Sequence, residues 1–436
     1  MLNKKNIFFK KKILIYGLGK SGLSSFKFLK KNNEIYLYDD KKIDNKNFEI
    51  KKKIIDYKKI TKKKIDHIII SPGININKCQ LSKFLKKNIK KVTTDLDIFF
   101  NFYGNNKNVT ITGTNGKSTT AKMLYEVFKQ QKMDVRLVGN IGNPILLEQN
   151  ITNKTIFVIE ASSYQLDYSK IFTSNVAAIL NISPDHLERH KTLRNYVRAK
   201  FGLIKKQTKK DFAILNTKNS YIQKELLAKN LLPKIVKINK QVDLKVLKKI
   251  NNPYFMTDGN KENLSFVIAI AKVFKIKKEN LYKALNKFNG LKYRQQIIFR
   301  SKKLTVINDS KATSFSSSVS ILKSMSNVYW IVGGLAKKKD KFLLSKNNCK
   351  NFRAYIFGKN NNFFIKELKN VMHYESFANL KLVIKKIFNE IKYNKNPNHQ
   401  TILFSPAAAS FDNFKNFEER GKYFNKLIKQ TNNVER

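Results

Sequence analysis

Cysteine is scarce in this 436-residue sequence, which holds only two copies. Cys79 and Cys349 lie far apart and match no metal-ligand spacing, which excludes a disulfide-stapled scaffold and a cysteine metal cluster. The sequence also lacks any uninterrupted apolar segment of about 18 residues, the length that a membrane-spanning helix needs. No signal peptide is recognisable. We therefore expect a cytoplasmic protein with reduced thiols and no membrane insertion.

Acidic residues are scarce as well, because 31 aspartates and glutamates stand against 87 lysines and arginines, for a formal net charge of +56. Such an excess would by itself indicate a nucleic acid or an anionic membrane as partner. Only nine of the basic residues are arginines, however, and lysine, asparagine and isoleucine are enriched together along the whole sequence. A phosphate-binding surface would concentrate its charge and favour the bidentate guanidinium. The charge thus indicates a compositional bias of solvated faces, and we expect no specific nucleic-acid partner.

Strand-like and helix-like segments alternate from end to end, which predicts an α/β fold. The predicted strands are 12–16, 34–38 and 67–70 in a first block, 109–112, 155–159, 176–181 and 212–215 in a second, and 304–307, 328–332, 354–357 and 401–404 in a third. We predict three domains. Residues 1–95 would form a Rossmann-like domain, residues 96–299 a central P-loop mononucleotide-binding domain, and residues 300–436 a second Rossmann-like domain.

The most informative segment is Thr112–Thr120, which follows a β-branched run and leads into a helix-like stretch from Ala121. Its glycines allow backbone N–H groups to surround phosphate oxygens, Lys117 can reach the terminal phosphates, and the Ser118 hydroxyl can ligate Mg²⁺. The first glycine, Gly113, stands closer to the Gly-Lys pair than the general P-loop template requires. A glycine turn without catalytic meaning is the alternative. The order of strand, Gly-Lys-Ser and helix favours a bound magnesium nucleotide.

A second glycine-rich turn, Gly17–Gly22, follows the first predicted strand, and Asp39 comes about twenty residues later. This pattern fits a dinucleotide fingerprint and would suit an oxidoreductase. The same geometry holds any diphosphate, however. A purely structural turn is the remaining alternative.

Polar residues follow two strands of the second block. Glu160 ends one strand and could hold Mg²⁺ together with Ser118. His186 follows the next strand in an Asp-His pair, which favours a role as ligand or general base. The alternatives are a surface acid and a structural histidine.

In the third block, two predicted strands are each followed by a turn of small and polar residues. These turns are Asn308–Thr313 and Ser405–Asp412. In a doubly wound sheet both would face one cleft and offer hydroxyl and ammonium donors to a small anionic substrate. Ordinary helix capping by these hydroxyl residues is the alternative.

Together these motifs resemble the Mur ligases, which use ATP to form amide bonds. The resemblance covers essentially the whole chain, and Asp309–Thr313 and Ser405–Arg420 are the segments that indicate the branch adding D-glutamate. It implies an acyl-phosphate intermediate formed from UDP-N-acetylmuramoyl-L-alanine and ATP, which D-glutamate then attacks, in peptidoglycan precursor synthesis. Other Mur ligases, folylpolyglutamate synthases, a nicotinamide dehydrogenase and a nucleic-acid ATPase are the rival functions.

The resemblance also implies roles for individual residues. The uridine nucleotide would be held by Lys20, Ser21, Asp39, Asp40, Gly73 and Asn140. ATP would be bound by Gly113, Thr114, Asn115, Gly116, Lys117, Ser118, Thr119, Asn260, Arg294 and Asp309. D-Glutamate would contact Lys311, Thr313, Lys337, Ser410 and Phe417, with Lys338 or Lys339 as alternatives to Lys337. Two Mg²⁺ ions would use Ser118, Glu160, His186 and Lys200, the last as a carbamate, and the catalytic residues would be Lys117, His186 and Lys200. A monomer is expected.

Three positions depart from the family pattern. Gly259 stands where the family has a histidine, and Gln296 and Leu335 stand where it usually has acids. None of these changes removes an implied metal ligand, so an active enzyme is expected.

Overall fold

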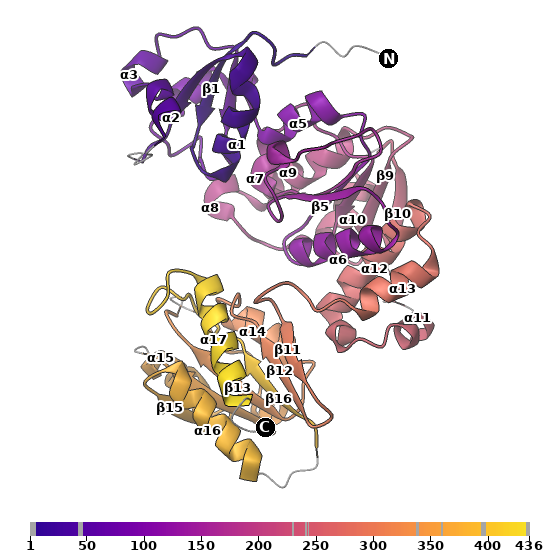
Figure 1. Ribbon diagram of the computed structural model, residues 1–436, viewed down its shortest axis with the longest axis vertical. Helices are drawn as coiled ribbons and strands as arrows, with labels where there is room; N and C mark the ends of the chain where they lie inside the picture. Colours follow the sequence, from indigo (N-terminus) through magenta and orange to yellow (C-terminus); the bar gives the residue numbers. More distant parts are fainter. Residues whose placement is uncertain are drawn as a thin grey trace. The chain divides into compact units, whose positions relative to one another are not determined.

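The computed structural model describes residues 6–41, 47–228, 231–239, 242, 244–336, 340–358, 361–393 and 398–432. Within them the backbone forms three sheets flanked by helices (Figure 1). The chain divides into two compact units, Met1–Leu244 with Asn263–Leu285, and Lys245–Glu262 with Asn286–Arg436. The first unit contains two of the sheets and the second contains the third. The predicted α/β class is confirmed.

The first sheet is parallel and has the strand order β2-β1-β3-β4. Its strands are β1 (Lys12–Tyr16), β2 (Glu34–Tyr38), β3 (His67–Ile70) and β4 (Val92–Thr93). Helices α1 (Lys20–Leu29), α2 (Phe48–Lys53), α3 (Tyr57–Ile60) and α4 (Ser82–Lys87) accompany them. The chain leaves β1 toward β2 on one side, and β3 lies on the other, so the turn after β1 stands at the switch point where open α/β sheets bind ligands.

The second sheet is also parallel, with the order β10-β9-β8-β5-β7-β6. Its strands are β5 (Asn108–Thr112), β6 (Val135–Gly139), β7 (Ile156–Glu160), β8 (Val176–Ile179), β9 (Phe212–Asn216) and β10 (Lys234–Ile238). The helices of the same unit are α6 (Lys117–Gln130), α7 (Ser163–Tyr168), α8 (Leu187–His190), α9 (Leu193–Lys205), α10 (Ser220–Leu227) and α13 (Lys278–Asn286). Helix α11 (Leu244–Lys249) belongs almost wholly to the second unit, and α12 (Asp258–Val273) begins in the second unit and continues in the first. Every residue of β5 and β7 is buried, as expected for central strands covered on both faces.

A buried carboxyl group ties helix α5 (Asp95–Tyr103) to the chain after α7. Asp97 accepts hydrogen bonds from the backbone N–H groups of Lys170, Ile171 and Phe172, between 2.8 and 3.0 Å. The hydroxyl of Ser169 donates to it at 2.9 Å. Asp97 is 1% exposed, so these donors replace the water that an ionised carboxylate would otherwise need. The core that α5 joins contains apolar residues of both sheets.

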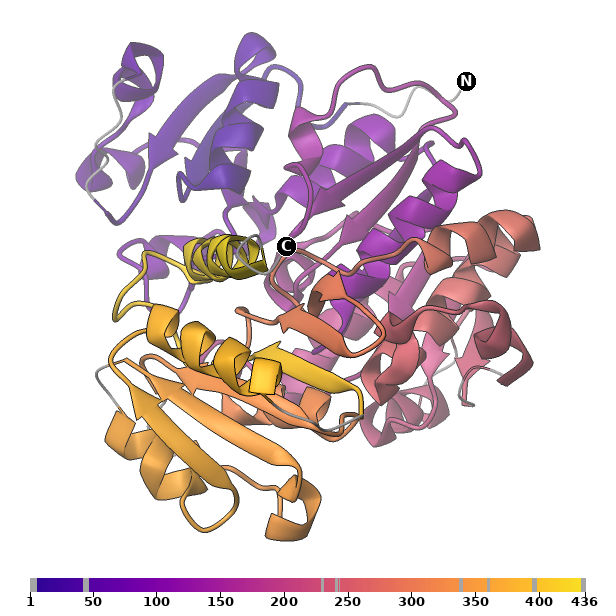
Figure 2. The same ribbon diagram turned by 60° about the horizontal axis from the view of Figure 1, so that its bottom comes forward.

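The third sheet has the order β11-β12-β16-β13-β14-β15, and only β11 is antiparallel to its neighbour. Its strands are β11 (Gln296–Arg300), β12 (Leu304–Asn308), β13 (Val328–Gly333), β14 (Phe352–Phe357), β15 (His373–Phe377) and β16 (Gln400–Phe404). One face packs against α14 (Phe315–Leu322) and α15 (Asn361–Leu368). Helices α16 (Leu380–Tyr393) and α17 (Phe417–Asn432) pack on the other face, and Figure 2 shows α16 in light orange and α17 in yellow.

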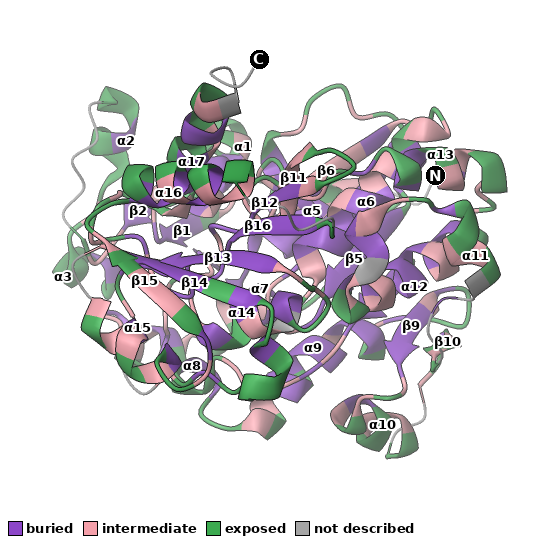
Figure 3. Ribbon diagram, turned by 90° about the horizontal axis from the view of Figure 1, so that it is seen from below, coloured by how far each residue is buried: buried purple, intermediate pink, exposed green. Residues whose placement is uncertain are grey.

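The structure contains all the predicted strands, with ends that differ by up to two residues. Helix α6 starts at Lys117, four residues before the predicted start at Ala121. The strands that the sequence did not indicate are β4, β6, β10, β11 and β15. All five lie at sheet edges. Edge strands carry a weaker apolar signal, as the pink and green segments of β10 and β15 in Figure 3 illustrate.

Two observations bear on the organisation of the chain. The predicted domain boundary at 299–300 falls inside β11, which pairs with β12 of the third sheet. The three domain ranges stay a prediction. Among the described residues, no helix combines the length and the apolar character that a membrane crossing demands.

Candidate active site

The loop between β5 and α6 has the backbone form that phosphate binding needs. Gly113 and Gly116 have φ angles of +152° and +81°, a region that favours glycine. A Cβ atom at Gly116 would stand 2.2 Å from Oδ1 of Asn263 on α12. Because that clash involves a buried side chain, any larger residue at position 116 would displace α12 or the loop. Ser118 is buried at the first turn of α6.

Two lysines converge on this loop. Lys117 donates to the carbonyl oxygen of Thr114 at 2.7 Å. Lys200 reaches the same loop from α9 and donates to the carbonyl oxygen of Gly113 at 2.8 Å. Its side chain is 1% exposed, and burial, followed by the charge of Lys117, lowers the pKa of Lys200 well below that of an ordinary lysine. The sequence could not predict this burial.

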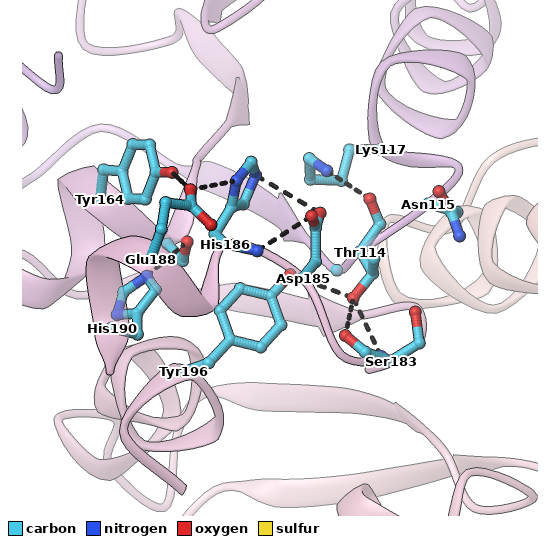
Figure 4. A network of polar contacts seen from close by, with 12 residues as sticks. Thr114, Asn115, Lys117, Tyr164, Ser183, Asp185, His186, Glu188, His190 and Tyr196 are labelled. Atoms are coloured by element: carbon cyan, nitrogen blue, oxygen red, sulfur yellow. Dashed lines mark hydrogen bonds and ion pairs between the residues drawn. The ribbon is translucent and has the colours of Figure 1, made fainter. Parts of the chain in front are cut away.

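The loop is braced by the segment after β8. Thr114 donates its backbone N–H to the carbonyl oxygen of Asn181 at 2.9 Å, and Asn115 donates its own to Oδ1 of Asn181 at 2.8 Å. The Thr114 hydroxyl accepts from the backbone N–H of Ser183 at 3.0 Å and lies 3.0 Å from the Tyr196 hydroxyl. Figure 4 shows the contacts of Thr114 with Ser183 and Tyr196. The loop is therefore fixed before any nucleotide arrives.

His186 lies beside this network with a left-handed backbone, φ +55°. Its ring nitrogens face two carboxyl groups, Nε2 at 3.4 Å from Asp185 and Nδ1 at 3.7 Å from Glu188. The ring of Tyr164 lies 4.9 Å from the imidazole, centroid to centroid, and its hydroxyl donates to Glu188 at 3.4 Å. Figure 4 shows the imidazole between the two carboxyl groups. The histidine is half exposed, so a ligand can reach it.

Glu160 at the end of β7 has one unsatisfied oxygen. Its Oε1 accepts from the Asn140 amide at 3.0 Å, whereas Oε2 is buried and has no hydrogen-bond partner among the described residues. A buried carboxylate oxygen without a donor is suited to a cation. In the part of the chain that the structure describes, no three His, Cys, Asp or Glu side chains gather as a metal site. A magnesium ion here would therefore need Ser118, phosphate oxygens or water as further ligands.

The glycines in and near the turn after β1 are of two kinds. Some are packed against neighbouring atoms and leave no room for a side chain, and others face open space. A Cβ at Gly17 would stand 2.7 Å from Cβ of Ser71, and one at Gly22 would stand 1.9 Å from the carbonyl oxygen of Gly17. At Gly19 and at Gly73 a Cβ would meet nothing within 4 Å. The first and third glycines thus serve the turn, and the open surface at the second suits the approach of a diphosphate.

The other residues predicted for this site lie around the same turn. Lys20 is exposed at the start of α1. The Ser21 hydroxyl donates to Asp95 at 2.6 Å, and the Gln165 amide approaches the same carboxyl group at 3.4 Å. Asp95 is buried, and burial raises its pKa. Ser21 is thereby connected to α7, directly after the strand that ends in Glu160.

Asn260 and Asn263 lie one turn apart on α12 with different surroundings. The Asn260 amide donates to the carbonyl oxygen of Tyr254 at 2.8 Å and to Oε1 of Gln295 at 3.2 Å. Asn263 lies against the phosphate loop at Gly116. Asn260 was predicted from the sequence and Asn263 was not, although the i, i+3 spacing places both on one helix face.

In the second unit, buried polar groups follow β12 and β16. Asp309 accepts from the Ser405 hydroxyl at 2.9 Å and from the backbone N–H of Gln295 at 3.0 Å. Burial raises the pKa of Asp309 to about 7. Arg294 precedes Gln295 and is half-buried.

The predicted D-glutamate residues gather at the same end of this sheet. The Lys311 ammonium lies 3.8 Å from the ring centre of Phe417, and burial lowers the pKa of Lys311. Ser410 is buried and Thr313 is half-buried. Lys337 lies outside the described residues.

Arg420, which the sequence analysis did not single out, joins the two turns. It is completely buried and donates to the carbonyl oxygens of Ser310 at 2.7 Å and Ala408 at 2.9 Å. Its Nε donates to the Ser310 hydroxyl at 3.1 Å. One guanidinium group therefore fixes the spacing of both turns.

Known protein families and sequences match this chain over most of its length. Residues 11–93 match the N-terminal domain of MurD-like Mur ligases, and residues 111–277 match the Mur ligase middle domain. The UDP-N-acetylmuramoylalanine–D-glutamate ligase of Rickettsia felis is 31% identical over 97% of both chains. The chain belongs to the MurD family of Mur ligases. The MurD enzyme of Rickettsia prowazekii is 32% identical over 98% of this chain and 99% of its own, and that of Caldicellulosiruptor bescii is 31% identical over 96% and 98%.

Solved structures of other Mur ligases share the fold of this MurD-family chain. The crystal structure of UDP-N-acetylmuramate–alanine ligase MurC from Thermotoga maritima matches with a TM-score of 0.54 and 15% identity, covering 97% of this chain and 100% of that one. MurF from Thermotoga maritima, solved in complex with ADP, matches with a TM-score of 0.53 and 13% identity over 98% and 100%. At these identities the likeness shows the fold alone.

Proposed function

We propose that this chain is an ATP-dependent ligase that joins D-glutamate to UDP-N-acetylmuramoyl-L-alanine, in peptidoglycan precursor synthesis. The observation that carries the proposal is a complete phosphate loop, Gly113–Thr119, beside the unsatisfied carboxyl oxygen of Glu160, in a chain that aligns over 97% of its length with a D-glutamate ligase.

The reaction begins with transfer of the γ-phosphoryl group of ATP to the alanyl carboxylate, which gives ADP and an acyl phosphate. The amine of D-glutamate then attacks the acyl carbon, the C–O bond to phosphate breaks, the amine loses a proton, and inorganic phosphate leaves. Backbone N–H groups of the loop and the Lys117 ammonium stabilise charge on the transferring group. Binding the three substrates in one arrangement removes the translational and rotational entropy cost of bringing them together, which lowers the activation barrier.

Two magnesium ions would supply charge neutralisation of the phosphate groups. Ser118 and Glu160 would hold one of them, since the first offers a hydroxyl and the second an unsatisfied buried oxygen. His186 and Lys200 would hold the other, with Lys200 as a carbamate. The buried Lys200 ammonium donates to a carbonyl and a hydroxyl oxygen, and a carbamate in its place would supply the anionic oxygen that Mg²⁺ prefers.

The first domain would bind the uridine diphosphate moiety through Lys20, Asp39, Asp40 and Gly73, supported by the open surface at the second glycine of its turn. The last domain would bind D-glutamate, with the Lys311 ammonium as partner for a substrate carboxylate and Thr313, Ser410 and Phe417 beside it. Arg294 and Asp309 would contact the nucleotide, and Asn140 would lie near the diphosphate.

The test is ADP release by the full-length protein with UDP-N-acetylmuramoyl-L-alanine, ATP and a panel of amino acids. We expect turnover with D-glutamate and none with L-alanine, L-lysine or meso-diaminopimelate. Equal turnover with one of the other amino acids would assign the chain to another activity of the family, and ADP release without any amino acid would indicate an uncoupled ATPase.

A further inference from the structure

Helices α2 and α3 carry large apolar side chains on their outer surface. Phe48 is 79% exposed, Tyr57 is 45% exposed, and Ile54, at the end of α2, is 37% exposed. Ile50 and Ile60 are buried and anchor the two helices. Figure 3 shows both helices mainly in green. A single exposed apolar residue is ordinary, whereas three within a short segment indicate an interaction surface.

Lysines surround these apolar positions. Residues 47–64 include eight lysines, all of them exposed, and no arginine. The two acids of this segment have local partners. Glu49 pairs with Lys30 at 2.7 Å, and Asp56 accepts a hydrogen bond from the backbone N–H of Lys58 at 2.8 Å. The lysines are Lys51, Lys52, Lys53, Lys58, Lys59, Lys62, Lys63 and Lys64. The segment therefore combines a strong positive charge with exposed apolar side chains.

We propose that segment 47–64 is a docking surface for an anionic lipid bilayer, with Phe48, Ile54 and Tyr57 inserted at the level of the headgroups. Lysine ammonium groups are attracted to anionic headgroups, and apolar side chains beside them enter the boundary between headgroups and acyl chains. Such docking is peripheral and needs no membrane-spanning helix. It goes beyond the proposed function, which concerns the substrates of the ligase alone.

Two features favour a lipid surface over single-stranded nucleic acid, the other polyanion that suits lysines and aromatic rings. Ile54 has no ring on which a base could stack. The segment also lacks arginine, whose guanidinium group is the better bidentate partner for a phosphate. Lysine and isoleucine serve a bilayer equally well, because attraction to headgroups needs only charge and insertion needs only an apolar side chain.

The lysine-rich composition of the whole chain requires a matched control surface. Residues 272–283 provide it, because they include five exposed lysines and no exposed large apolar side chain, and the structure describes all of them. These lysines are Lys272, Lys275, Lys277, Lys278 and Lys283. Both surfaces attract an anionic bilayer through charge, and only segment 47–64 adds apolar side chains that can insert.

The experiment is sedimentation of the full-length protein with vesicles, either of phosphatidylcholine alone or of phosphatidylcholine and phosphatidylglycerol in equal amounts. The variants are the double Phe48→Ser, Tyr57→Ser, the patch triple Lys51→Ser, Lys52→Ser, Lys53→Ser, and the control triple Lys277→Ser, Lys278→Ser, Lys283→Ser. We expect wild type to bind the anionic vesicles far better than the neutral ones. The double variant and the patch triple should each lower the partition coefficient by about tenfold or more, and the control triple by about twofold or less.

Insertion itself is measured with Phe48→Trp. Trp330, the only tryptophan of the chain, is fully buried in the core of the third sheet and gives a constant background. We expect the emission of Phe48→Trp to shift to shorter wavelength on anionic vesicles. Unchanged emission of the bound protein, or equal losses in the two lysine triples, would overturn the inference, since either would mean adsorption by charge alone. Tighter binding to a single-stranded oligonucleotide than to vesicles would also overturn it, and so would a concentration-dependent dimer that the double variant abolishes.

Discussion

The ammonium nitrogen of Lys200 lies 2.8 Å from the carbonyl oxygen of Gly113, and so inside the base of the phosphate loop. The ring of Tyr196, one turn earlier on α9, lies 4.5 Å from the same nitrogen. Neither partner is anionic. A buried cation held in this way is costly unless it is neutralised or modified, which makes Lys200 the most sensitive position for testing the proposed chemistry.

Substitutions of Lys200 should distinguish a role of its positive charge from a role of the proposed carbamate. We expect Lys200→Ala to lose roughly a hundredfold or more in turnover and to recover in part with added formate or acetate, which can replace the missing oxygen ligand. Lys200→Arg should stay inactive, because arginine keeps the cation and cannot carry the carbamate. Lys205→Ala, at an exposed position of the same helix, is the control. Steady-state ADP release measures all three, and full activity of Lys200→Arg would contradict the two-metal assignment.

Lys117→Ala should abolish ligation and leave UDP binding intact, because the phosphate loop and the turn after β1 are separate sites. Loss of a cation at the transferring phosphoryl group should cost several powers of ten in rate. The matched control is Lys122→Ala on the same helix, where the half-exposed lysine forms an ion pair with Glu126 and lies over the ring of Tyr125. Near-normal turnover of Lys117→Ala would show that ATP binds elsewhere.

Asp97→Ala should destabilise the first unit. The substitution leaves backbone N–H groups of three successive residues without their acceptor, and we expect a loss of roughly 3 kcal/mol or more in the free energy of unfolding. Urea unfolding followed by circular dichroism measures it. Glu126→Ala removes a half-exposed ion pair with Lys122 and should change stability by less than about 1 kcal/mol. Similar midpoints for the two variants would contradict this role of Asp97.

His190 should make stability depend on pH. Its ring is buried and lies 3.0 Å from the Ser163 hydroxyl, and burial, together with nearby positive charges, lowers its pKa to about 4. An unfolded histidine titrates near 6.5, so the unfolded state binds the proton first and stability is lost as the pH falls from about 6.5 to 4. Between pH 7 and 5 the loss should approach about 2 kcal/mol.

His190→Gln removes this group, and the difference in urea midpoint between pH 7 and pH 5 should be smaller in the variant than in wild type. An unchanged difference would show that other groups cause the acid sensitivity.

The phosphate loop could be predicted because its signal is contiguous. A β-branched strand, two glycines, Lys117 and Ser118 occur in sequence order, and backbone geometry follows from them directly. The turn after β1 could be located for the same reason, whereas the contacts that distinguish its structural glycines from its open ones are visible only in the folded chain.

The burial of individual side chains, and their contacts with residues distant in sequence, could not be predicted. Lys200 is one lysine among many in the sequence, and only the packing of α9 against β5 distinguishes it. Asn263 and Arg420 were missed for the same reason, since the contacts that define them come from residues distant in sequence. The edge strands β10 and β15 were missed because lysine, histidine and glutamate interrupt their apolar pattern.

Arg420 marks a position where lysine could not replace arginine, although the chain is rich in lysine. Most basic positions of this chain are lysines, and on a solvated face either cation serves. The guanidinium of Arg420 makes three hydrogen bonds to two turns from a fully buried position, whereas an ammonium ends in a single point and loses its charge more readily when buried. The spacing of two loops therefore depends at this position on a planar fork that lysine does not supply.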